Sequence, residues 1–468
     1  MAEQRPRLPS LAQQSRQRVP VDYLLRPFGQ LARMPALGGG LLVAATIVAM
    51  LWANSPWAEQ YQALLQTKFA IGDGRAPLSK PLILWINDLL MALFFLLVGL
   101  EIKREAMVGE LRSIRKAALP LVAAAGGMAV PGLIYAAINL TGEGGAPRGW
   151  GVAVATDIAF ALGLLALLGR RIPASIRVFL ATLAIADDIG ALVVIAVFYT
   201  EQLGYNWLAY AAGALLGLLA LNRLGVRNPT PYFLVGLALW YFTFKSGVHA
   251  TIAGVLMAAT IPATRRVDSD EFLAYCRSAL DSFERSHHRD QRQERHELIS
   301  GDEQAAVEAV EQACALVEPA LPRLERILVP WVAFVIVPVF ALANAGVAVS
   351  AQTVGALASP VGLGIVLGLA IGKPVGIVAA CWLAVKLGIA RLPDGVRWGH
   401  IVGTGMLAGI GFTMSLFIAV LAFPEGEALE GAKLAVLSAS ILAAAGGLST
   451  LWWVSRTRPP ASDASARS

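Results

Sequence analysis

Charged residues and cysteines are scarce in this sequence. Asp, Glu, Lys and Arg make up 15% of its 468 residues, whereas a soluble globular chain carries about 25%. The three cysteines, Cys276, Cys314 and Cys381, are far apart, which argues against a disulfide framework or a metal site. Low charge together with 56% hydrophobic residues predicts a chain that is surrounded by lipid.

The beginning of the sequence lacks the apolar core of a cleavable signal peptide. Residues 1–36 are polar and basic, and we expect them to form a cytoplasmic tail. The formal net charge of +6 does not predict nucleic-acid binding, because the basic residues lie mainly in alternate loops between apolar runs. We therefore expect a lipid bilayer and no nucleic acid among the partners.

Twelve apolar runs alternate with polar segments. A membrane-spanning helix needs about 20 mostly apolar residues, so the sequence predicts an all-α polytopic membrane protein with about 12 transmembrane helices. The runs lie near residues 37–53, 82–100, 117–139, 149–168, 175–199, 205–222, 229–244, 247–263, 328–349, 358–385, 401–422 and 431–454.

The basic residues predict the orientation of these helices. Placing the N-terminus inside puts 31 of the 38 Lys and Arg residues in cytoplasmic segments and five in external loops. This asymmetry predicts cytoplasmic termini in a bacterial inner membrane. The expected segments are an N-terminal tail (1–36), helices 1–8 (37–263, with an external loop at 54–81), a cytoplasmic insertion (264–327), helices 9–12 (328–455) and a C-terminal tail (456–468).

Two connections are long. In the external loop, Ala70–Gly74 is a turn signal, and a β-hairpin and an irregular loop both remain possible. In the cytoplasmic insertion we expect two short amphipathic helices, and we favour packing at the membrane face over a binding role. Their predicted apolar stripes are Phe272, Cys276, Ala279 and Phe283, and Val307, Val310, Cys314 and Val317.

Glycines form two different patterns late in the sequence. Gly364, Gly368, Gly372 and Gly376 recur every four residues on one face of the tenth run, which predicts close contact with another helix. The glycines at 403, 405, 409 and 411 are less regular, and we expect a break in the eleventh helix.

Four of the charged residues inside apolar runs suggest a function. They are Asp157, the adjacent Asp187 and Asp188, and Lys373, and each charge at the bilayer centre costs about 2.5–3.5 kcal/mol. An ion pathway is the usual reason for such residues. A purely structural ion pair between Asp187 and Lys373 would leave the other two aspartates without a basic partner.

Adjacent buried carboxylates suit competition between Na⁺ and H⁺. Na⁺ is a hard cation that prefers oxygen ligands, and two neighbouring carboxylates repel, so one of them is expected to hold a proton or a cation. Consecutive helical residues point about 100° apart. We therefore expect Asp187 to face Lys373 and Asp188 to face an aqueous funnel.

Two other functions fit part of this pattern. An intramembrane aspartyl protease also uses two membrane aspartates, but its carboxylates converge from different elements, and Lys373 would have no role. A Na⁺-coupled solute symporter would need a roomy polar cavity, for which Thr156, Thr404 and Thr413 are the few candidates.

Seven stretches of the sequence resemble NhaA-type Na⁺/H⁺ antiporters. They occur in family order over about residues 80–265 and 325–455. The matching stretches are Phe94–Glu105, Ala155–Gly163, Ala184–Ala191, Gly247–Gly254, Ala343–Val347, Gly372–Pro374 and Gly409–Ser415.

The resemblance implies a fold and a transport cycle. Inverted repeats with discontinuous helices are a known property of this family, here implying spans three to five and ten to twelve, with the fourth and eleventh broken and crossing. It also implies that Asp188 carries Na⁺ or H⁺, that Asp187 exchanges a proton and pairs with Lys373, and that Thr156 and Asp157 assist. Li⁺ should be accepted, exchange should be electrogenic, and no cofactor is expected.

The resemblance further implies a pH-sensing cytoplasmic funnel and a homodimer. An ordinary charged helix end is the alternative for the funnel residues. The 54–81 loop matches the region through which relatives form dimers. The funnel residues are Glu101, Lys103, Arg104, Glu105 and Glu325.

Overall fold

The computed structural model describes residues 35–71, 78–200, 203–264, 269–292, 301–317, 319–424 and 426–456. The predicted tails lie almost wholly outside these ranges. So do the turn residues at 72–74 and part of the polar run between the two insertion helices.

The described residues form the membrane bundle expected from the sequence. Among them, seven helices are long and apolar enough to cross a membrane, and two further pairs are bent at a short break. With the shorter helices α10, α11 and α12, this makes about twelve spans. In chain order they are α3 (Pro35–Ala53), α5 and α6 (Leu82–Trp85, Met91–Met107), α7 (Ile114–Thr141), the 3-10 helix η3 and α8 (Pro147–Val154, Ile158–Leu167), α9 (Ala174–Phe198), α10 (Tyr205–Arg223), α11 (Pro229–Lys245), α12 (Thr251–Thr260), α15 and α16 (Ala320–Trp331, Val337–Asn344), α18 and α19 (Pro360–Leu367, Lys373–Lys386), α20 and α21 (Trp398–Ala408, Phe412–Ala422) and α22 (Glu427–Arg456).

Spans three to five and ten to twelve form an inverted repeat. In each group the middle span is broken: η3 ends at Val154 before α8 begins at Ile158, and α20 ends at Ala408 before α21 begins at Phe412. The third span corresponds to the tenth, the fourth to the eleventh and the fifth to the twelfth. Because successive spans alternate in direction, the two members of each of these pairs run in opposite directions. The two breaks meet near the middle of the bundle, where Asp157 N donates to Ile410 O at 2.7 Å.

The glycine stripe on the tenth span packs against α7, as predicted. A Cβ built on Gly376 would lie 2.1 Å from Gly126 O, and one on Gly372 would lie 3.0 Å from the Pro131 Cα. Only hydrogen fits at these points. The absence of side chains therefore brings the first spans of the two repeats into backbone contact.

A π-helical turn, Gly368–Gly372, precedes Lys373 in the tenth span. The ring of Pro374 would clash with the carbonyl of residue 370 in a regular α-helix. Widening the helix by one residue relieves such a clash. The same combination of a wide turn and a proline, Val332–Ile336 and Pro338, occurs in the ninth span. The turn sets the direction in which Lys373 leaves α19.

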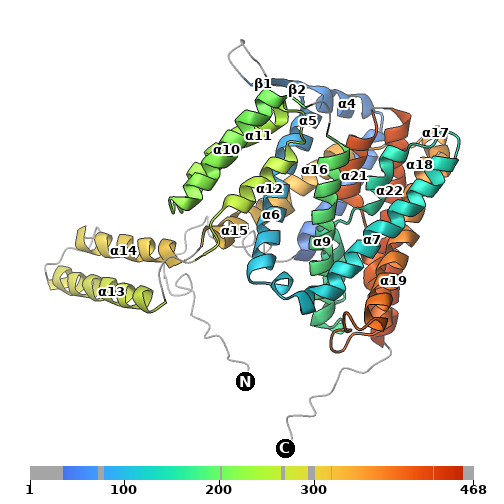
Figure 1. Ribbon diagram of the computed structural model, residues 1–468. Coiled ribbons are helices and arrows are strands. Elements are labelled where there is room, and N and C mark those ends of the chain that lie inside the picture. The colour runs from blue at the N-terminus through green and yellow to red at the C-terminus, as the bar shows by residue number, and fades with distance from the viewer. Residues whose placement is uncertain are drawn as a thin grey trace, which may run out of the picture.

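A short helix and a hairpin cover one end of the bundle (Figure 1). Helix α4 (Ala58–Gln66) is turned by 112° from the first span. Its Tyr61 hydroxyl donates to the carbonyl of Leu342 at 2.7 Å. Strands β1 (Lys68–Ile71) and β2 (Leu78–Pro81) pair antiparallel, with Lys68 opposite Pro81. Of the two possibilities left open for this loop, the hairpin is present.

Helices α13 (Ser269–Arg292) and α14 (Gly301–Val317) pack against each other beside the bundle (Figure 1). Of the stripe predicted on α13, Ala279 is buried and Phe272, Cys276 and Phe283 are half-buried. The stripe predicted on α14 is wrong in part, because Val307 and Cys314 are exposed, whereas Glu303, Ala306 and Ala313 are buried. Small alanines permit the close approach of the two helices. The next span begins at Ala320, so Glu325 lies inside it rather than before it.

Candidate functional site

Asp187 and Asp188 lie side by side in the middle of α9, and both are 2% exposed. Lys373 Nζ approaches Asp187 Oδ2 to 2.6 Å and also donates to the carbonyl of Val154, the last residue of η3. Carbonyls at the C-terminal end of a helix carry partial negative charge. The Lys373 ammonium thus lies between a carboxylate and a half-helix terminus, and is fully buried.

Asp157 joins the N-termini of both second half-helices. It is the N-cap of α8, where Oδ1 accepts from Phe160 N at 2.9 Å. Its Oδ2 accepts from the Thr413 hydroxyl at 2.5 Å and from Thr413 N at 3.2 Å, in the first turn of α21. Negative charge is stabilised at helix N-termini, and here one carboxylate serves two of them.

Thr156 and Ser415 complete the crossing. The Thr156 hydroxyl donates to Ala408 O, the last residue of α20, and the Ser415 hydroxyl donates to Val152 O in η3, each at 2.8 Å. The ends of η3 and α20 therefore each accept a hydrogen bond from a side chain of the opposite repeat. The sequence did not assign roles to Thr413 and Ser415; their signal is the glycine-flanked break just before a new helix begins.

Two carboxylate oxygens at this site have no partner. Asp188 Oδ2 and Asp187 Oδ1 are buried and form no hydrogen bond with the described residues. Asp188 is only 2% exposed, and its orientation toward a water-filled funnel stays a prediction. The site thus holds an incompletely paired set of two carboxylates and one lysine.

Most of the predicted funnel residues lie together near the end of α6. Arg104 pairs with Glu325 at 2.8 Å and with Glu105 at 3.5 Å. Glu101 lies on α6 three residues before Arg104 and four before Glu105, so it shares their face of the helix. Lys103 does not join them: its Nζ donates to Ala259 O at 2.7 Å and to Ile261 O at 2.5 Å, where it caps the C-terminus of α12.

The geometry argues against a protease or a resident metal centre. Both oxygens of the Asp157 carboxylate already accept hydrogen bonds at helix N-termini, which explains this residue without a protease reaction. Within the described ranges, no group of three or more His, Cys, Asp or Glu side chains is arranged to hold a metal ion.

Comparison with known proteins identifies the family. The profile of the family described as Na⁺/H⁺ antiporter 1 matches residues 30–451. The Na⁺/H⁺ antiporter NhaA of Oleidesulfovibrio alaskensis is 51% identical over 94% of this chain and 97% of its own length. That of Koribacter versatilis is 46% identical over 95% and 96%. This chain therefore belongs to the NhaA family of Na⁺/H⁺ antiporters, which makes it a multi-pass membrane transporter and not an enzyme.

Proposed function

We propose that this protein exchanges cytoplasmic Na⁺ or Li⁺ for external H⁺, electrogenically, for pH and sodium homeostasis. The observation that carries the proposal is the buried Asp188 oxygen without a hydrogen-bond partner, beside Asp187. An uncompensated charge in a low-dielectric interior is very costly. A bound proton or a bound cation removes that cost, and the two cannot occupy the same oxygens together.

Asp188 is the main carrier in this scheme, and Asp187 supplies a second proton. While Lys373 pairs with Asp187, that carboxylate is ionised; when the pair opens, it takes up a proton. Loading of one Na⁺ then displaces protons from two carboxylates, so each cycle moves net charge. Asp157 and Thr156 hold the crossing together and offer further oxygens to the ion.

Access to the site follows from rearrangement of the crossing. Both carboxylates are only 2% exposed, so the crossing would have to rearrange to admit ions, as in alternating access. We assign the cluster of Arg104, Glu105 and Glu325, with Glu101 one turn earlier on α6, to the pH-dependent control of cytoplasmic access. Lys103 has a structural role at α12 instead.

The positive-inside pattern supports cytoplasmic termini and an external hairpin. The hairpin has two strands in the described residues, so each strand retains an unpaired edge. Such edges pair readily with another chain. We propose that two copies associate through this hairpin as a homodimer in the inner membrane.

Asp188→Asn tests the exchange mechanism. In everted vesicles carrying a pH gradient, Na⁺ and Li⁺ should dissipate the gradient with the wild type and the exposed-site control Asp281→Asn, but not with Asp188→Asn. K⁺ should have no effect, and an imposed membrane potential should change the rate. Undiminished exchange by Asp188→Asn would exclude this carboxylate as the carrier. A response that needs both Na⁺ and an organic solute would favour the symporter.

A further inference from the structure

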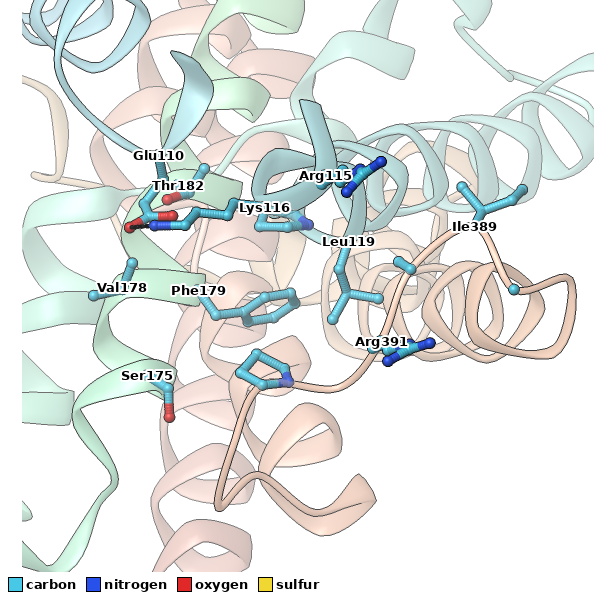
Figure 2. Close-up of a pocket in the computed structure, with 14 residues that line it drawn as sticks. Glu110, Arg115, Lys116, Leu119, Ser175, Val178, Phe179, Thr182, Ile389 and Arg391 are labelled. Atoms are coloured by element: carbon cyan, nitrogen blue, oxygen red, sulfur yellow. Dashed lines mark ion pairs between the residues drawn. The ribbon is translucent and has the colours of Figure 1, made fainter. Parts of the chain in front are cut away.

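A cavity of about 780 Å³ opens at the end of the bundle where α7 and α9 begin and α19 ends (Figure 2). It lies at the boundary of three spans, Arg115–Thr141, Ala174–Phe198 and Pro360–Lys386. None of the ion-site residues lines it. Thr182, the deepest lining residue on α9, precedes Asp187 by five positions.

The lining residues converge for local reasons. Arg115 and Lys116 are in the first turn of α7, and Ser175 is in the first turn of α9. Gly388 ends α19 with a φ of +71°, and Ile389 N donates back to Ala384 O at 3.0 Å. This glycine-dependent termination directs Ile389 and Arg391 to the cavity.

A further hydrogen bond fixes the loop that carries Arg391. The Ser175 hydroxyl donates to the carbonyl of Asp394 at 3.2 Å. The loop after the tenth span is thereby attached to the start of the fifth. One side of the cavity thus belongs to the second repeat and the other to the first.

The cavity is electropositive. Three basic side chains and Glu110 line it, and Glu110 pairs with Lys116 at 3.8 Å. Arg115 and Arg391 form no ion pair with the described part of the chain. Figure 2 shows both on the side where Ile389 lies, away from the Glu110–Lys116 pair. The N-termini of α7 and α9 add partial positive charge.

The same cavity has an apolar wall. Val178 is 46% exposed and Ile389 is 58% exposed, and Leu119 and Pro120 continue the surface. Free phosphate would gain nothing from these side chains. A molecule with a phosphate at one end and hydrocarbon at the other matches both halves, and basic pockets between transmembrane helices bind lipid headgroups of this kind.

We propose that the cavity binds an anionic phospholipid. Arg115 and Arg391 hold the headgroup phosphate with bidentate hydrogen bonds, and Val178 and Ile389 contact the glycerol and the first acyl carbons. The lipid joins α7 and α9 to the loop that follows α19, and so connects the two repeats at this surface. Binding does not depend on the ion-exchange mechanism.

The test uses the purified full-length chain in detergent and measures lipid retention by native mass spectrometry and thermal unfolding. Phosphatidylglycerol, phosphatidylcholine and inorganic phosphate are added separately. The variant Arg115→Gln/Arg391→Gln is compared with the charge-matched control Arg223→Gln/Arg277→Gln, whose side chains are remote from the cavity lining. The single variant Arg391→Gln, in a loop, serves where the double variant does not fold.

Phosphatidylglycerol should be retained by the wild type and the control and should raise their unfolding temperature. The rise should be less than half as large in the cavity variants, and phosphatidylcholine should produce little rise in any of them. An equal effect of inorganic phosphate at the same concentration would overturn the lipid assignment. Undiminished retention by the cavity variants would overturn the site. Neither outcome bears on Na⁺/H⁺ exchange, because no transport is measured.

Discussion

Lys373 has two acceptors of different kinds, the Asp187 carboxylate and the Val154 carbonyl. The first is an ion pair and the second neutralises a half-helix terminus. A buried ion pair contributes little compared with apolar packing, but loss of one partner leaves an uncompensated charge. The effect of removing Lys373 should therefore depend on whether Asp187 is still charged.

Lys373→Met should lower the free energy of unfolding by about 3–5 kcal/mol, because it isolates the Asp187 carboxylate. Asp187→Asn/Lys373→Met removes both charges and should recover more than half of that loss. Unfolding of both variants in mixed micelles, with the wild type as reference, measures the difference. Equal destabilisation of the single and double variants would show that the pair is not the main interaction of Lys373.

Asp157 supports two helix N-termini through one side chain. Asp157→Ala should cost about 2–4 kcal/mol, since it removes a helix cap and a charged hydrogen bond. Asp157→Asn keeps an acceptor oxygen and should cost less. Asn228→Ala, which removes an ordinary cap from α11, is the matched control and should cost about 1 kcal/mol. An Asp157→Ala variant as stable as this control would contradict the double role.

The sequence identifies the charged residues of the site, since carboxylates within apolar runs are conspicuous. It predicts the partner of Asp187, because Lys373 is the basic residue in the middle of another span. It does not predict that Thr413 bonds to Asp157, which depends on how the two breaks cross. It also does not predict that Lys103 donates to the carbonyls of Ala259 and Ile261, because tertiary packing decides which neighbouring groups a lysine near a helix end can reach.

At the scale of the helices, the glycine spacing of the tenth span predicts a contact that the structure contains, the one between α7 and α19. Glycines spaced four apart lie on one face of a helix, so the stripe itself predicts a contact. The partner helix and the wide turn before Lys373 are not visible in that spacing. By contrast, α14 has apolar residues on more than one face, and two residues of its predicted stripe, Val307 and Cys314, are exposed.

Gly376→Ala should destabilise the bundle by roughly 1–3 kcal/mol, because its Cβ meets a backbone oxygen and neither helix can yield locally. Gly213→Ala in α10 is the matched control: nothing lies within 4 Å of its Cβ. That control should be neutral or stabilising by about 0.5–1 kcal/mol, from the lower entropy of the unfolded chain. Thermal unfolding in detergent compares them. Similar midpoints for both variants would mean that α7 and α19 separate easily.

The whole molecule combines a crossing core with two additions, the hairpin and the α13–α14 pair. The core is stabilised by contacts between the repeats, at the crossing and along α7 and α19. The α13–α14 pair has its main contact within itself. The chain segments just before α13 and just after α14 are already in contact, since Leu321 N donates to Pro262 O at 3.2 Å. The core should therefore be able to fold without the pair.

Replacement of residues 266–318 by a short Gly/Ser linker tests this separation. We expect an unchanged unfolding midpoint and retained Na⁺-dependent exchange in vesicles, because a linker can close the gap that the Pro262–Leu321 contact already bridges. The Arg104–Glu325 pair, which lies beyond the replaced segment, should also keep the pH dependence of exchange unaltered. A shifted pH profile with an unchanged unfolding midpoint would contradict this expectation and would give helices α13 and α14 a regulatory role. A lowered midpoint would instead show that α13 and α14 stabilise the core.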